Sequence, residues 1–307
     1  MSLVALSLLA LAVVVAVIAV VLVGALVLLL ARRTAPDPSD AATAARHHAG
    51  AVSGIAWAAL TVSLLLGPAV AGMVDGLRQG VALGLVPAVA GVVFVAIHAG
   101  GELTWPRPTG TVRRAGLERR GTGDVAPRGL RGLLWGWVGL VVLIVGAGGA
   151  VATDGRQISR TFDGGAASSS PFPGWFYGLP LLLACVVVLA STEAVLRVVA
   201  TRSAVVDAQP RWDTALRRLS AHRALRGAQL VVGLTAAGLL LTAGMALRNV
   251  GQAFRDDGTG SVLHSVTGTT AMVVALVVGL IAVIVALLPG RPAGQLSEPA
   301  LVDPAPR

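Results

Sequence analysis

A histidine and a carboxylate at helical spacing, His98 and Glu102, are the residues of this chain best placed to do chemistry. Four residues apart, they fall on one face of a helix. His47 and His48 come just before the apolar run 52–74. If that run and the run that carries His98 form a helical hairpin, all four side chains come together. Such a cluster could bind Zn²⁺ or relay protons. It could equally lie at headgroup level, with Glu102 paired to a nearby arginine. Since no H-E-x-x-H motif occurs, we expect no metal and no cofactor.

A second carboxylate, Glu193, lies deeper in an apolar run. It follows Trp175 by 18 residues, which at about 1.5 Å per residue places it about 27 Å along a helix, near the inner edge of the hydrocarbon. Arg197 lies four residues on, so a local ion pair is the simplest interpretation. Ionisable residues inside spans also mark substrate or proton pathways. Glu193, together with His98 and Glu102, is therefore a candidate for substrate or proton coupling.

Three arginines lie in the connections on the opposite side of the predicted helices: Arg78, Arg156 and Arg248. If the helical hairpins pack together, these side chains could converge on an anion. The alternative is that they are solvated residues at helix ends. The sequence leaves both interpretations open.

The elements that must position these residues are membrane-spanning helices. Only 13% of the residues are charged and the mean hydropathy is +0.80, whereas a soluble domain has about 25% charged residues. Seven apolar runs approach or exceed the roughly 20 residues that cross a bilayer: 3–31, 52–74, 81–99, 132–152, 175–199, 229–247 and 264–288. We therefore expect an all-α polytopic bundle of about seven transmembrane helices, one leading helix followed by three helical hairpins.

The arginines orient this bundle. All 24 basic residues are arginine, and alternate connections carry 19 of them on one side and 5 on the other. Because basic residues stay in the cytoplasm, we expect the N-terminus outside and the C-terminus inside, in the plasma membrane. The net charge of +9 then fits anionic lipid headgroups, met by the arginine-rich loops 107–131 and 197–226, rather than nucleic acid. A protein partner or a homo-oligomer also fits.

The chain divides at its basic connections into one membrane domain with five parts. These are a leading helix (1–31), hairpin 1 (32–131), hairpin 2 (132–228), hairpin 3 (229–288) and a disordered cytoplasmic tail (289–307). The outer turns of the three hairpins share small residues, then an Asp or Arg, then an amide. A parallel duplication would explain this, and so would coincidence in a chain rich in glycine and alanine.

A basic amphipathic helix is expected over 211–227. Trp212, Leu216 and Leu219 fall on one face, while arginines such as Arg217 and Arg218 occupy much of the rest. Such a helix is typical of one that lies on the anionic inner leaflet, extends the next span or docks a partner.

One segment carries a resemblance to known proteins. It reads Gly101-Glu102-Leu103-Thr104-Trp105-Pro106-Arg107-Pro108-Thr109-Gly110, followed by Val112-Arg113-Arg114. In this segment the chain resembles uncharacterised multi-pass integral membrane proteins of high-GC actinobacteria. The resemblance spans about 52–250, supports the membrane class, and implies no activity and no site residues.

No segment carries a catalytic motif in the right setting: there is no G-x-S-x-G elbow, Rossmann loop or Walker loop. The single cysteine, Cys185, excludes an intrachain disulfide. We therefore expect a non-enzymatic structural, accessory or interaction protein. The main alternative is a transporter of small solutes or ions that uses Glu193 and the face of His98 and Glu102. A third possibility is a membrane enzyme acting on a lipid, which would need a cleft holding two or more of the four His and Glu side chains.

Overall fold

A computed structural model describes residues 40–105, 121–205, 210–254 and 258–290 of the chain. The predicted leading span 3–31 and most of the predicted tail lie outside the described residues, as does the first part of the arginine-rich loop 107–131. The described part is helical apart from one β-hairpin.

Six of the described helices are long and apolar enough to cross a membrane, which indicates a multi-pass membrane protein. They are α2 (Asp40–Ala71), α3 (Arg78–Leu103), α5 (Arg128–Val151), α6 (Trp175–Thr201), α7 (Pro210–Gln252) and α8 (Val262–Leu287). A four-residue helix, α4 (Thr122–Val125), precedes α5, and the strands β1 (Ile158–Phe162) and β2 (Gly165–Ser169) separate α5 from α6.

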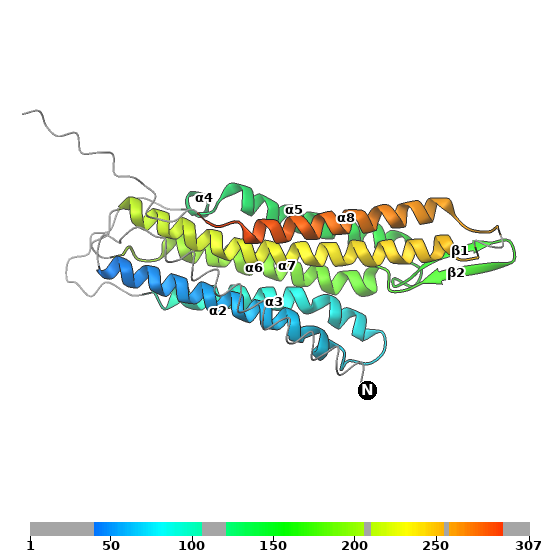
Figure 1. The fold of residues 1–307 in the computed structure, drawn as a ribbon, viewed down its shortest axis with the longest axis horizontal. Coiled ribbons are helices and arrows are strands. Elements are labelled where there is room, and N and C mark those ends of the chain that lie inside the picture. The colour runs from blue at the N-terminus through cyan, green and yellow to red at the C-terminus, as the bar shows by residue number, and fades with distance from the viewer. Residues whose placement is uncertain (1–39, 106–120, 206–209, 255–257, 291–307) are drawn as a thin grey trace, which may run out of the picture.

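The six long helices form three antiparallel hairpins, α2–α3, α5–α6 and α7–α8, stacked side by side (Figure 1). We call one end of the bundle the basic end; there α2, α5 and α7 begin and α3, α6 and α8 end. The opposite end, which carries β1 and β2, is called the hairpin end. The three predicted hairpins are thus present, although the structure does not test whether they arose by duplication.

Helix α7 is the central element of the bundle. It packs against α2, α3, α5, α6 and α8 and is the most deeply buried span. At about 1.5 Å per residue its 43 residues extend about 64 Å, twice the thickness of the hydrocarbon core. The sequence predicted a surface helix over 211–227 and a separate span over 229–247. In the structure both segments belong to the single helix α7. This agrees with the alternative in which the surface helix extends the next span.

The remaining boundaries differ modestly from the predicted ones. Helix α2 begins at Asp40, 12 residues before the predicted start at 52, because the alanines that follow Asp40 pack against Trp105 and Trp212. Pro68, Pro87 and Pro180 lie inside α2, α3 and α6, which remain continuous.

The connection between α5 and α6 contains a β-hairpin, which the sequence analysis did not predict. Its strands pair from Ile158 with Ser169 to Phe162 with Gly165. The two-residue turn between them is Asp163-Gly164, in which Gly164 has a φ of 93°. Asp-Gly between short strands is a strong hairpin signal, and the prediction overlooked it. Ile158 and Ala167 pack against Ala243 and Val250 of α7.

Candidate functional site

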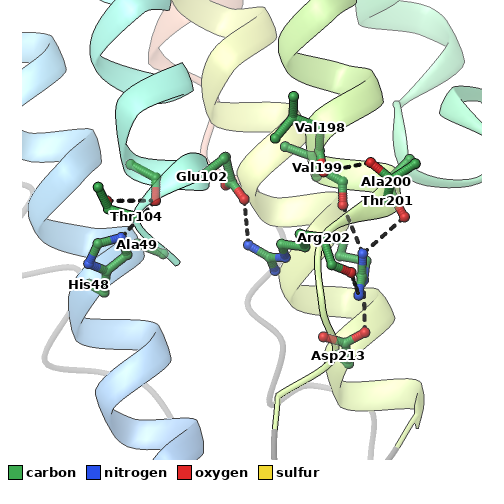
Figure 2. A network of polar contacts seen from close by, with 12 residues as sticks. His48, Ala49, Glu102, Thr104, Val198, Val199, Ala200, Thr201, Arg202 and Asp213 are labelled. Carbon is green, nitrogen blue, oxygen red and sulfur yellow. Dashed lines mark hydrogen bonds and ion pairs between the residues drawn. The ribbon is translucent and has the colours of Figure 1, made fainter. Parts of the chain in front are cut away.

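The polar side chains that the structure buries gather at the basic end. Glu102, at the end of α3, accepts a hydrogen bond from the guanidinium of Arg202 at 2.8 Å (Figure 2). Both side chains are buried, at 7% and 2% exposure. The Arg202 guanidinium also lies 3.7 Å from the centre of the Trp105 ring, a cation–π contact. Burial lowers the pKa of Arg202, and the Glu102 carboxylate opposes that shift.

A second buried arginine, Arg217 of α7, closes the end of α6. Its Nε donates to Asp213 at 2.8 Å, an i,i+4 pair on the same helix. Its other nitrogens donate to three backbone carbonyls at the end of α6, those of Val199 (2.9 Å), Ala200 (3.0 Å) and Arg202 (2.8 Å). The last carbonyls of a helix have no partner in their own helix. Arg217 therefore caps α6 and ties it to α7.

Arg217 also corrects the predicted amphipathic helix. The sequence placed it on the polar face, exposed to headgroups, yet only 2% of the residue is exposed. Trp212 and Leu216 are buried as predicted. Arg217 joins them because the carboxylate of Asp213 and the carbonyls of α6 neutralise its charge, as a buried cation requires.

The predicted histidine cluster is assembled in part. His48, His98 and Glu102 line one small cavity together with Ser220 and Arg223. The cavity holds about 10 Å³, which is room for roughly one water molecule. His48 contacts the Gly101 carbonyl through Nε2 at 2.9 Å, and its ring meets Trp105 edge-on.

His47 does not join this group, because it is exposed on α2. In the described residues no three His, Cys, Asp or Glu side chains are gathered as a metal ion would need. His98 is 4% exposed and packs edge-on against Phe94. Its Nε2 has no hydrogen-bond partner in the structure.

Glu193 is paired, but not with the predicted partner. Both of its oxygens accept from Arg131 of α5, with Nε at 2.8 Å and a terminal nitrogen at 2.9 Å. Trp135 donates to the same carboxylate at 3.1 Å. Arg197, the predicted local partner, is near enough to act electrostatically on Glu193, but the hydrogen-bonded ion pair is made by Arg131. A bidentate Arg–carboxylate pair between two helices has a better geometry than an i,i+4 pair along one helix.

The three predicted outer arginines are not brought together. Arg78 and Arg248 are exposed, and Arg156 is half-buried in the turn before β1. At this end of the molecule the α2–α3 hairpin diverges from α7 and from the β-hairpin (Figure 1). The start of α3 nevertheless packs against the start of α6, where Gly80 faces the Tyr177 ring. The structure shows no contact among the three arginines, so the predicted convergence on an anion has no support in the described residues.

Sequence reasoning missed one fully buried polar residue in the middle of the bundle. Gln229 of α7 accepts from Trp137 Nε1 at 3.2 Å and donates to the Ala282 carbonyl at 2.9 Å. It links α5, α7 and α8, and both ends of its amide are satisfied. Thr192 and Thr235, buried in α6 and α7, donate to carbonyls in their own helices.

Arg202, Asp213 and Arg217 were also missed as site residues. The i,i+4 spacing of Asp213 and Arg217 was a readable signal for their pair. The pairing of Glu102 with Arg202 joins positions 100 residues apart, and nothing in the sequence alone indicates it.

Comparison of this chain with protein-family models, with curated proteins and with solved structures gives no match.

Proposed function

We propose that this chain is a multi-pass plasma-membrane protein with a structural, accessory or interaction role and no enzymatic chemistry. The observation that supports this proposal is that three carboxylates of the helices, called here the inner carboxylates, are all paired. Glu102, Glu193 and Asp213 each form an ion pair with an arginine. Each of these carboxylates is already engaged by a guanidinium at 2.8 Å, which suits a structural role in holding helices together.

The proposed topology has seven spans, with run 3–31 as the first, the N-terminus outside and the C-terminus inside. The basic end then faces the cytoplasm, as the positive-inside rule requires. Labelling of a single introduced cysteine tests this, with the buried Cys185 replaced by alanine. An impermeant maleimide added to intact cells should label Ser169→Cys and spare Thr122→Cys. Labelling of Thr122→Cys from outside would reverse the topology.

The interaction role follows from the rigidity of the basic end. Arg217 caps α6, and Glu102 and Arg202 join α3 to α6 across the bundle. Exposed arginines such as Arg211 and Arg218 lie on the outside of this cross-linked end. A fixed, cationic surface suits anionic headgroups or an acidic cytoplasmic partner.

The transporter alternative rests on one observation, the cavity beside His98. A transporter of the usual kind has a polar cavity near the bilayer midplane, made by discontinuous helices. This cavity is instead at the basic end, holds about one water molecule, and is flanked by continuous helices. The lipid-enzyme alternative uses the same cavity. It is weaker still, because Glu102, the carboxylate that such an enzyme would use, is already held by Arg202.

Flux measurements separate these functions. The full-length protein in proteoliposomes should give no protein-dependent proton or ion flux under a pH gradient or a membrane potential. In the same preparations, Glu102→Gln should lower the temperature of unfolding, because it leaves Arg202 buried without its partner. A flux that Glu102→Gln or Glu193→Gln abolishes, with unfolding unchanged, would establish the transporter instead.

A further inference from the structure

Within the described residues, the basic end carries two arginines that form no ion pair with a described carboxylate. Arg223 and Arg226, one helical turn apart on α7, lie close enough to each other and to Arg46 for their charges to repel. Arg223 donates to the Ala49 carbonyl and Arg226 to the Leu288 carbonyl, both at 2.9 Å. In the part of the chain that the structure describes, neither forms an ion pair with a carboxylate.

Polar groups without partners lie within this positive cluster. His98 Nε2 is buried and has no hydrogen bond, and the same holds for Arg226 Nε and for Nδ1 of His222. A buried polar atom left unpaired costs about 1–3 kcal/mol. In native proteins such an atom usually marks a bound water or ion. Both Arg223 and Arg226 are near enough to act electrostatically on His98.

Of these groups, His98 and Arg223 line one cavity, whereas His222 and Arg226 do not. Arg223, His98 and Ser220 line it from α7 and α3, and Ser220 is itself buried. Glu102 lines it too, but its charge is balanced by Arg202 at 2.8 Å. A guanidinium has five N–H donors, of which Arg223 uses one on Ala49. The cavity thus combines an unpartnered imidazole nitrogen, a hydroxyl and spare guanidinium donors under a net positive field.

We propose that this cavity is an oxyanion site that binds a phosphate group by one oxygen. The oxygen accepts from His98 Nε2–H and from the Ser220 hydroxyl, and the Arg223 guanidinium neutralises its charge. The cavity is the size of one oxygen atom, and the rest of the phosphate lies at its partly open mouth. Guanidinium groups match phosphate geometry well. The site also lies near the end of α3, at the basic end of the bundle.

The same chemistry is offered by an anionic lipid headgroup and by free inorganic phosphate, so the test uses both. Purified full-length protein, stripped of lipid in a neutral detergent, is titrated with phosphatidylglycerol or with inorganic phosphate at constant ionic strength. Unfolding temperature reports binding, because a ligand of the folded state raises it. We expect a saturable rise with at least one ligand. A rise with phosphatidylglycerol alone identifies a lipid site, and a rise with inorganic phosphate identifies a site for the free anion.

Substitutions test whether the ligand-dependent rise in unfolding temperature comes from binding in the cavity. Arg223→Gln should weaken the apparent affinity by about tenfold, the worth of one charge-assisted hydrogen bond. Arg211→Gln removes the same charge from an exposed position on the same helix, and should leave the affinity within about twofold, as expected for an exposed charge. Ser220→Ala, which changes packing least, provides the readout if Arg223→Gln does not fold. No saturable rise with either ligand, or equal losses in Arg211→Gln, would overturn the site and leave a water-filled cavity.

The oxyanion site does not depend on the proposed function. A transporter or an accessory protein could equally carry it, and flux in proteoliposomes tests a different property from phosphate-dependent unfolding.

Discussion

Different interactions hold the helices together at the two ends of the bundle. At the basic end, charged side chains make the contacts between helices, through Glu102 with Arg202 and Arg217 with the carbonyls of α6. At the hairpin end, close approaches of backbone dominate, as where Gly244 of α7 faces the Gly268 carbonyl of α8. Buried charges hold helices together where an opposite charge or a carbonyl faces them, whereas small residues hold them by allowing close packing.

The largest change in the free energy of unfolding is expected when the arginine that caps α6 is replaced. Arg217→Met should lower the free energy of unfolding by about 3–5 kcal/mol, because it leaves Asp213 and three carbonyls buried without their donor. Unfolding in a denaturing-detergent titration measures the effect. Arg211→Met, at an exposed position of the same helix, should change it by less than about 0.5 kcal/mol. Equal effects of the two variants would remove the distinction between buried and surface arginines.

The hairpin end is tested by adding one methyl group. A Cβ at Gly244 would lie 2.7 Å from the Gly268 carbonyl oxygen and 2.9 Å from the Met272 nitrogen. Gly244→Ala should therefore cost about 1–3 kcal/mol, as overpacking does. On the same helix Gly238 has open space around it, so Gly238→Ala should be neutral or stabilising by up to about 1 kcal/mol. Equal tolerance at both positions would show that close approach is not what joins α7 and α8.

The smallest effect is expected at Glu193, whose partner Arg131 is 35% exposed. Glu193→Gln should cost about 1 kcal/mol, since an exposed partner is screened by solvent and the amide retains one acceptor. Thermal unfolding measures this cost, and Arg197→Gln, beside it on α6, provides the matched control. A larger loss in Arg197→Gln would restore the local pair that the sequence predicted.

The sequence predicted the helices better than it predicted their polar contacts. Apolar runs located all six described spans because lipid selects length and hydropathy directly. Contacts between distant positions carry no such pattern. Glu193 had an arginine at the expected local spacing, yet Arg131, 62 residues away, holds it. Gln229 went unnoticed because one amide in an apolar helix gives no periodic signal. The β-hairpin was predictable from Asp163-Gly164 and was overlooked.

The residues of the site were likewise predicted only in part. Helical spacing put His98 and Glu102 on one face, and the structure does gather them with His48 around one cavity. Ser220 and Arg223, which complete that cavity, come from a helix more than 100 residues further along the chain. Only the packing of α7 against α3 and α2 brings them there.

The claim that the inner carboxylates are structural is tested most directly by a double-mutant cycle on Glu102 and Arg202. Glu102→Gln and Arg202→Gln should each destabilise the full-length protein, because each leaves its partner's charge buried and unpaired. The double variant should cost less than the two single variants together, by about 2 kcal/mol or more. Additive costs of the two substitutions, or single variants that are as stable as the parent protein, would contradict the account.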